Sequence, residues 1–282
     1  MIRKLLKYDI LSLYKVICFI SVAPIIASVV GGFALRYLNS TDFETVYSSD
    51  TAAFAENVAS FTYFISILAI IAAMVSMTIF IFARFYKNLY TDEGYLTFTL
   101  PASHRDILVS KTINAVIWTC YQILLSLICI CIYTLICGNL GDALSGMWKL
   151  VAWCFETVGA WMVVYIILGA LAALGGILFS VCLIQFCITT GALFAKKAKL
   201  IAGIATYYAV NTLLGFIMQS FLLAFIIGGL EPFLSFVFDQ SQTIRCIVYM
   251  LIVLAVLLVA WGLAACAHFA TKRLVDRRLN LA

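Results

Sequence analysis

Six long runs of apolar residues constrain this chain more than any other feature of its sequence. A helix that crosses a membrane needs about 20 residues with few charges, and each run reaches that length with no Asp, Glu, Lys or Arg in its middle. The runs are predicted to be transmembrane helices at residues 16–38, 61–83, 113–137, 157–195, 200–228 and 246–270.

The composition of the chain agrees with a lipid environment. Of 282 residues, 65% are hydrophobic and 11% are charged, whereas soluble domains have roughly 45–50% and 25%. A soluble globule is therefore excluded, and the apolar content also excludes a disordered chain. The sequence predicts an all-α, polytopic membrane helix bundle that forms one transmembrane domain over residues 1–282.

The basic residues predict how the helices are oriented. With six spans and both termini in the cytoplasm, 15 of the 18 Lys and Arg residues face the cytoplasm, and Arg36, Lys149 and Arg245 lie outside. Dividing the stretch 150–194 into two spans would place nine Lys and Arg residues on each side of the membrane, a distribution that the positive-inside rule disfavours. One span is therefore expected there, preceded by an interfacial helix around residues 144–156.

The residues before the first span are predicted to form an amphipathic helix on the cytoplasmic surface of the membrane. Apolar side chains recur at helical spacing through residues 1–15, and the basic side chains occupy other faces. The alternative is a positively charged flank of the first span without a helix of its own.

No motif indicates chemistry carried out by this chain itself. The nucleotide-binding pattern GxxxxGK[ST] and the patterns HExxH and GxSxG are absent. The ten cysteines lie almost entirely in apolar runs, where they behave as small buried hydrophobic residues. We therefore expect no enzymatic activity, no bound cofactor or metal, and no nucleic-acid partner.

Three polar residues within the predicted spans are candidates for a substrate path: Gln185, Asn211 and Gln219. Uncharged polar residues in membrane helices also form hydrogen bonds between helices, worth about 0.6 kcal/mol each on average, and this alternative stays open. No Asp, Glu, His, Lys or Arg lies in mid-span, where carriers coupled to ions or protons usually have one. Energy for any transport is therefore expected to enter from the cytoplasmic side.

The loop at residues 84–112 mixes charged and bulky apolar side chains, which is typical of a surface that docks on another protein. Ser103, followed three residues later by Asp106, predicts a helix start at His104. A helix from there to Cys137 would be about 51 Å long, which exceeds a hydrocarbon core of about 30 Å. Its first turns are expected to protrude into the cytoplasm.

Part of this loop resembles the E-x-G…L-x-x-P-x-S-R-x-x-I-L-x-x-K segment of type 2 ATP-binding-cassette (ABC) permeases, which are exporter-like membrane subunits. The six spans, the basic start and the short basic end are similar to that family as well. The close resemblance covers about 20 residues, carried by Asp92-Glu93-Gly94, Leu96, Leu100-Pro101-Ala102-Ser103, Arg105, Ile107-Leu108 and Lys111.

The resemblance implies a division of labour between subunits. A separate ATPase, which binds ATP and magnesium, would dock on the loop, and this chain would form the translocation pathway with a second permease copy or a homologue in a bacterial-type plasma (inner) membrane. The residues implied in ATPase coupling are Tyr90, Asp92, Glu93, Gly94, Leu96, Leu100, Pro101, Ser103 and Arg105.

Two further points follow from the resemblance. Family members carry a short re-entrant element between the fifth and sixth spans, for which the apolar residues 231–238 are the candidate. Glu93 and Arg105 are expected to make polar contacts with the ATPase, the alternative being solvated charges on a tight turn. The loop also fits another class of protein, a membrane sensor or assembly factor that docks a cytoplasmic partner without transporting anything.

Overall fold

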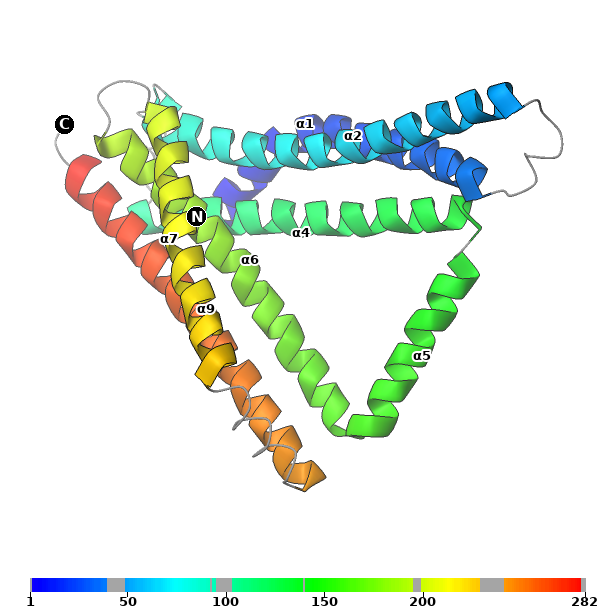
Figure 1. The fold of residues 1–282 in the computed structure, drawn as a ribbon. Coiled ribbons are helices and arrows are strands. Elements are labelled where there is room, and N and C mark those ends of the chain that lie inside the picture. The colour runs from blue at the N-terminus through cyan, green and yellow to red at the C-terminus, as the bar shows by residue number, and fades with distance from the viewer. Residues whose placement is uncertain are drawn as a thin grey trace. The chain divides into compact units, whose positions relative to one another are not determined.

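The computed structural model describes residues 2–39, 49–91, 93–94, 103–138, 140–194, 199–228 and 241–279. In these ranges all regular secondary structure is helical, as the sequence predicts, and Figure 1 shows the order of the elements. The helices are α1 (Ile2–Asn39), α2 (Ser49–Tyr90), α4 (His104–Ile136), α5 (Leu140–Val158), α6 (Trp161–Phe194), α7 (Lys199–Gly228) and α9 (Gln242–Leu279).

Six of these helices are long and apolar enough to cross a membrane, namely all except α5. Each overlaps most of one of the apolar runs found in the sequence. The prediction of a multi-pass membrane helix bundle is therefore confirmed. The predicted re-entrant element at residues 231–238 lies outside the described residues.

The structure does not support a separate amphipathic helix at residues 1–15. Ile2–Asn39 is one continuous and mainly apolar helix, because no glycine, proline, asparagine or aspartate lies between Ser12 and Pro24 to end it. Pro24 itself lies inside the helix and is buried.

Two glycines with left-handed backbone angles separate α5 from its neighbours. Gly138 (φ +80°) follows α4, and Gly159 (φ +67°) follows α5, as is common at helix C-termini. The apolar stretch 150–194 is therefore divided between two helices, of which only α6 has the character of a span. That helix begins at Trp161 rather than at the predicted Thr157.

The chain folds as two compact units. The first consists of Arg3–Ala83 and Ile113–Trp153, and the second of Met1–Ile2, Arg84–Thr112 and Cys154–Ala282.

In the first unit, α1, α2 and α4 pack together through small and polar residues. A Cβ on Gly31 of α1 would overlap a side chain of α2. The hydroxyl groups of Ser21 and Tyr121 lie 3.0 Å apart and join α1 to α4, while Gln122 Nε2 of α4 donates to the carbonyl oxygen of Met74 in α2 at 2.7 Å. Close backbone approach and interhelical hydrogen bonds are the usual means by which membrane helices associate.

In the second unit, α6 packs against both α7 and α9 (Figure 1). Gly191 of α6 and Gly203 of α7 approach so closely that no Cβ fits on Gly191. On the other side, Trp261 of α9 donates its Nε1–H to the carbonyl oxygen of Leu171 at 3.2 Å. The same indole covers Gly175, where a Cβ would lie 2.6 Å from Nε1. Helix α6 is thus the element that holds this unit together.

Candidate functional site

The loop with the family resemblance connects two helices whose ends belong to the second unit. We call this region the α2–α4 joint and define it as the described residues of 84–112, that is, 84–91, 93–94 and 103–112. It contains the C-terminal end of α2, a turn, and the N-terminal end of α4.

Ser103 caps α4. Its Oγ accepts a hydrogen bond from the backbone N–H of Asp106 at 3.1 Å, and its carbonyl oxygen accepts one from Ile107 at 3.1 Å. The predicted helix start at His104 is therefore confirmed, because the serine satisfies a backbone donor that has no partner within the helix. The helix continues for 33 residues to Ile136, about 50 Å at 1.5 Å per residue.

A buried apolar cluster fixes the two ends of the joint to each other. Phe85 and Leu89, four residues apart on one face of α2, pack with Leu108 of α4, and none of the three is more than 4% exposed. Tyr90 and Ile188 of α6 pack against this cluster. Removing a side chain of this kind from water stabilises the packed state by about 1.5–3 kcal/mol, so the cluster is the main anchor of the joint.

A row of polar side chains joins α2 and α4 to the same part of α6. The Tyr90 hydroxyl lies 2.7 Å from Thr189 Oγ1. Because Thr189 donates its own proton to the carbonyl oxygen of Gln185 at 2.8 Å, the tyrosine is the donor of the pair. From the other side, the Thr112 hydroxyl of α4 lies 2.9 Å from Gln185 Oε1 and 3.0 Å from the carbonyl oxygen of Leu108, and its one proton is shared between these two acceptors. Displacing either end of the joint therefore pulls on one turn of α6.

Gln185 is itself almost completely buried, at 1% exposure. Its amide nitrogen has no hydrogen-bond partner in the described part of the chain. A buried donor left in this state costs about 1–3 kcal/mol. The unpaired amide nitrogen therefore lowers the local stability of the packed helices.

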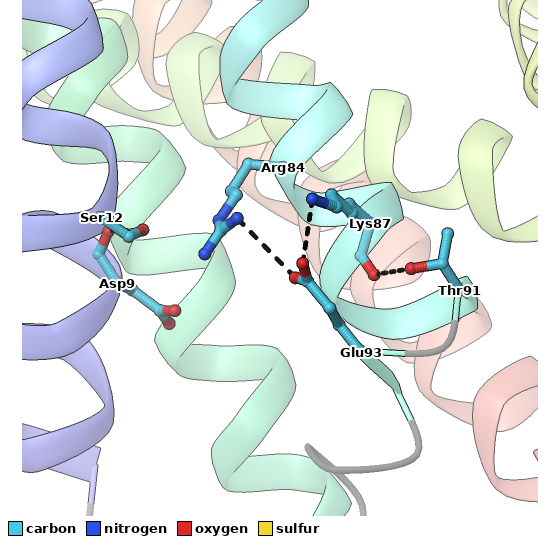
Figure 2. A network of polar contacts seen from close by, with 6 residues as sticks. All are labelled: Asp9, Ser12, Arg84, Lys87, Thr91 and Glu93. Carbon is cyan, nitrogen blue, oxygen red and sulfur yellow. Dashed lines mark hydrogen bonds and ion pairs between the residues drawn. The ribbon is translucent and has the colours of Figure 1, made fainter.

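Glu93 lies among positive charges from both ends of the joint, and Figure 2 shows the two at the end of α2, Arg84 and Lys87. Its Oε1 lies 3.0 Å from Lys87 Nζ, and its Oε2 lies 3.7 Å from an Arg84 guanidinium nitrogen. With its amide nitrogen turned toward Glu93, Asn88 donates to Glu93 Oε2 at 3.0 Å and accepts from Lys111 Nζ at 2.8 Å. The hydrogen bond from Lys87, and then the charges of Lys87, Arg84 and Lys111, hold the pKa of Glu93 below its ordinary value.

These ion pairs are partly exposed, and the side chain of Lys87 is 59% exposed. Solvent screens such pairs, so that each adds little to stability. Their effect is to orient the turn between α2 and α4.

The turn also requires glycine at position 94. The backbone N–H of Gly94 donates to the carbonyl oxygen of Thr91 at 2.7 Å, and a Cβ on Gly94 would lie 2.6 Å from the carbonyl oxygen of Leu89. Thr91 Oγ1 donates to the carbonyl oxygen of Lys87 at 2.5 Å (Figure 2). Any larger residue at position 94 must move this backbone.

A further contact links the joint to α9. His104 Nδ1, in the first turn of α4, lies 3.3 Å from Asp276 Oδ1 near the end of α9. The joint therefore contacts both α6 and α9 of its unit.

The structure brings together four of the residues implied in ATPase coupling, because Tyr90, Glu93, Gly94 and Ser103 all take part in the contacts described above. Arg105 is exposed and forms neither a hydrogen bond nor an ion pair with any residue in the described ranges. The remaining candidates, Asp92, Leu96, Leu100 and Pro101, lie outside the described residues.

The three candidates for a substrate path have different surroundings. Gln185 is buried and hydrogen-bonded to Thr112, whereas Asn211 and Gln219 occupy exposed positions of α7. For Gln185, the structure shows the hydrogen bond between helices that the sequence left as an alternative.

Sequence reasoning did not select Arg84, Lys87, Asn88, Lys111 or Thr112 as site residues. A signal for the first three was present, since positions 84, 87 and 88 share one face of a helix that leads directly into Glu93. Thr112 offered no such signal, because its partner Gln185 is 73 residues away in the sequence.

The joint is attached to α6 by apolar packing and by side-chain hydrogen bonds from both α2 and α4. Over the described ranges, no group of three or more His, Cys, Asp or Glu residues could hold a metal ion. Comparison with known proteins gave no match to a family model, a curated protein or a solved structure.

Proposed function

We propose that this chain is the membrane-spanning permease subunit of an ABC-type exporter, driven by a separate ATPase that docks on the α2–α4 joint. The single observation that supports this most is that the segment resembling ABC permeases is tied to α6 as well as to the two helices it connects. A docking loop can move membrane helices only if it is firmly attached to them.

In this proposal, closure of the ATPase pair displaces the joint. Leu108 and Thr112 carry the displacement into α4, and their contacts with α2 and α6 make these helices move with it. The chain works as a dimer with a second copy or a homologue, with both termini in the cytoplasm of a bacterial-type plasma membrane. The excess of Lys and Arg in the loops assigned to the cytoplasm supports this orientation.

The two charged candidates for the ATPase contact have different roles. Glu93 is engaged by Lys87 and Arg84 within the chain, so it shapes the joint. Arg105 is exposed in the first turn of α4, so its guanidinium is available to an acidic group of the partner. Arg105 is therefore the residue through which the ATPase contact is tested most directly.

The experiment is to co-express the tagged chain with an ABC ATPase encoded beside it and to measure the ATPase recovered on purification. Arg105→Glu is expected to reduce the recovery without changing the melting temperature of the chain. Lys149→Glu, a charge reversal at an exposed position of α5 outside the joint, is the matched control. Equal recovery with the two variants would refute the Arg105 contact.

The runner-up, a sensor or assembly factor, predicts a different result. The wild-type chain would then co-purify with a cytoplasmic protein that is not an ATPase, and Arg105→Glu would weaken that complex instead. Absence of any ATPase from the purified wild-type complex would favour this second function over transport.

A further inference from the structure

We infer that α5 binds the lipid bilayer directly, lying along the membrane surface with the side chains of Leu144, Met147, Trp148 and Val151 inserted among the acyl chains. These four residues are called the apolar face of α5 below. The inference does not depend on the transport function, because it rests only on the geometry of α5 and on its connections to two candidate spans.

The sequence of α5 produces two opposite faces. The apolar face follows the spacing i, i+3, i+4 and i+7, which aligns side chains along one side of a helix. Asp142, Ser145 and Lys149 recur at i, i+3 and i+7 on the other side, where Glu156 continues their stripe one heptad further and Trp153 lies between Lys149 and Glu156. By contrast, α6 and α7 carry no such charged stripe, as expected of helices surrounded by apolar groups.

In the described part of the chain, the apolar face of α5 is exposed. Its four side chains are 40–73% exposed, with Trp148 the most exposed. Exposure of so much apolar surface to water would cost about 25 cal/mol per Å². A surface of this kind requires an apolar environment.

The connections of α5 identify that environment as the bilayer. Only residues 137–139 separate α5 from the candidate span α4, and only residues 159–160 separate it from the candidate span α6. An extended chain reaches at most about 3.6 Å per residue, so three residues bridge about 11 Å. Both ends of α5 are therefore held close to the hydrocarbon core of the bilayer. Lipid is then the apolar environment nearest to the apolar face of α5.

A spanning orientation of α5 is disfavoured on two grounds. Lys149 would lie close to the bilayer centre, where a charged side chain costs about 2.5–3.5 kcal/mol on insertion scales. An additional span would also place nine basic residues on each side of the membrane, against the positive-inside rule. The charged stripe therefore faces water, and the helix axis lies parallel to the surface.

The charges on α5 also define the kind of lipid contact. Asp142, Lys149 and Glu156 give the helix one more negative than positive charge. Attraction to anionic headgroups, which basic amphipathic helices use, is therefore not available to α5. Insertion depends on the acyl chains and is independent of the headgroup charge.

The test uses the full chain reconstituted into vesicles of phosphatidylcholine, with and without phosphatidylglycerol. A photoreactive benzoylphenylalanine replaces Met147 or Val151 on the apolar face, or Ser145 or Lys149 on the polar side as matched controls, and lipid adducts on α5 are measured by mass spectrometry. Adducts are expected to be several-fold more abundant at the two apolar positions, in equal amount in both kinds of vesicle.

Three other results would overturn the inference. Crosslinks from Met147 or Val151 to a second polypeptide would show that protein covers the face. Similar lipid adducts at all four positions would indicate a spanning helix, and adducts that depend on phosphatidylglycerol would indicate headgroup attraction.

A second measurement avoids bulky replacements. Lys149→Cys is treated with a membrane-impermeant maleimide on both sides of the vesicle, with the parent chain, which carries the native Cys154, as control. Labelling above the parent is expected for a surface helix, and protection from both sides would contradict it.

Discussion

The α2–α4 joint and α5 are both connections to helix α4, at its two ends, and they are held in place by different partners. In the joint, apolar residues from α2, α4 and α6 converge, so that Leu108 is only 2% exposed. In α5 the apolar residues form a stripe on one helix, and Val151 is 40% exposed. Both connections mix apolar and charged residues. The α2–α4 joint is nevertheless held by contacts with other helices, whereas the apolar face of α5 is assigned to lipid.

The largest difference between the two regions is expected when an apolar side chain is shortened to alanine. Leu108→Ala should lower the free energy of unfolding by about 2–5 kcal/mol, because it leaves a cavity between helices. Val151→Ala, on the exposed face of α5, should change it by no more than about 0.5 kcal/mol. Thermal unfolding in nanodiscs compares the two, and equal losses would remove the distinction between the connections.

The next comparison concerns two glycines, whose replacement by alanine is expected to change the stability of the chain in opposite directions. Gly94→Ala should destabilise the chain by about 1–3 kcal/mol, as overpacking does, because the new Cβ meets the Leu89 carbonyl. Gly146→Ala in α5, where the position is open, should stabilise the helix by up to about 1 kcal/mol. Denaturant titration of both variants provides the measurement, and a neutral Gly94→Ala would show that the turn tolerates a side chain.

A smaller effect is expected from the polar contact with α6. Thr112→Val keeps the shape of the side chain but removes the donor to Gln185, at a cost of about 0.6 kcal/mol, typical of hydrogen bonds between membrane helices. Ser145→Ala removes a hydroxyl whose hydrogen bond, among the described residues, stays within α5, and it serves as the control. If the two variants unfold at the same temperature, the Thr112–Gln185 contact does not stabilise the joint.

The smallest effect is a pH dependence at Glu93. Because its pKa is lowered in the folded chain, the stabilisation is present above the ordinary glutamate value of 4.5 and is lost as pH falls through the lowered value. Glu93→Gln should therefore differ from the wild type most at neutral pH and least in acid. The melting temperatures of the wild type and of Glu93→Gln, measured from neutral to acid pH, test this prediction. A difference in melting temperature that does not change with pH would show that the ion pairs of Glu93 do not cause it.

Local signals in the sequence were sufficient for several elements. The start of α4 at His104 could be predicted because Ser103 satisfies a donor only three residues away. A separate helix around residues 144–156 could be inferred from the distribution of Lys and Arg along the chain, which allows only one span in the stretch 150–194. The predicted amphipathic surface helix at residues 1–15 is not supported, because amphipathic spacing does not end a helix in the absence of a residue that breaks it.

Contacts between distant segments could not be predicted in the same way. Tyr90 and Thr189 are 99 residues apart, and nothing near either residue indicates the other. The contact of Gly191 with Gly203 depends on how α6 and α7 pack, and many small residues in membrane helices make no such contact. Gly169 and Gly176, for example, have open space around them.

The sequence by itself determined the membrane environment, the number of candidate spans and the start of α4, because hydropathy and helix capping act over a few residues. Only the tertiary structure decided that Gln185 bonds Thr112, that Glu93 is paired within the chain while Arg105 is exposed, and that the apolar face of α5 is open. These properties depend on which helices meet, and that is set by packing of side chains far apart in the sequence.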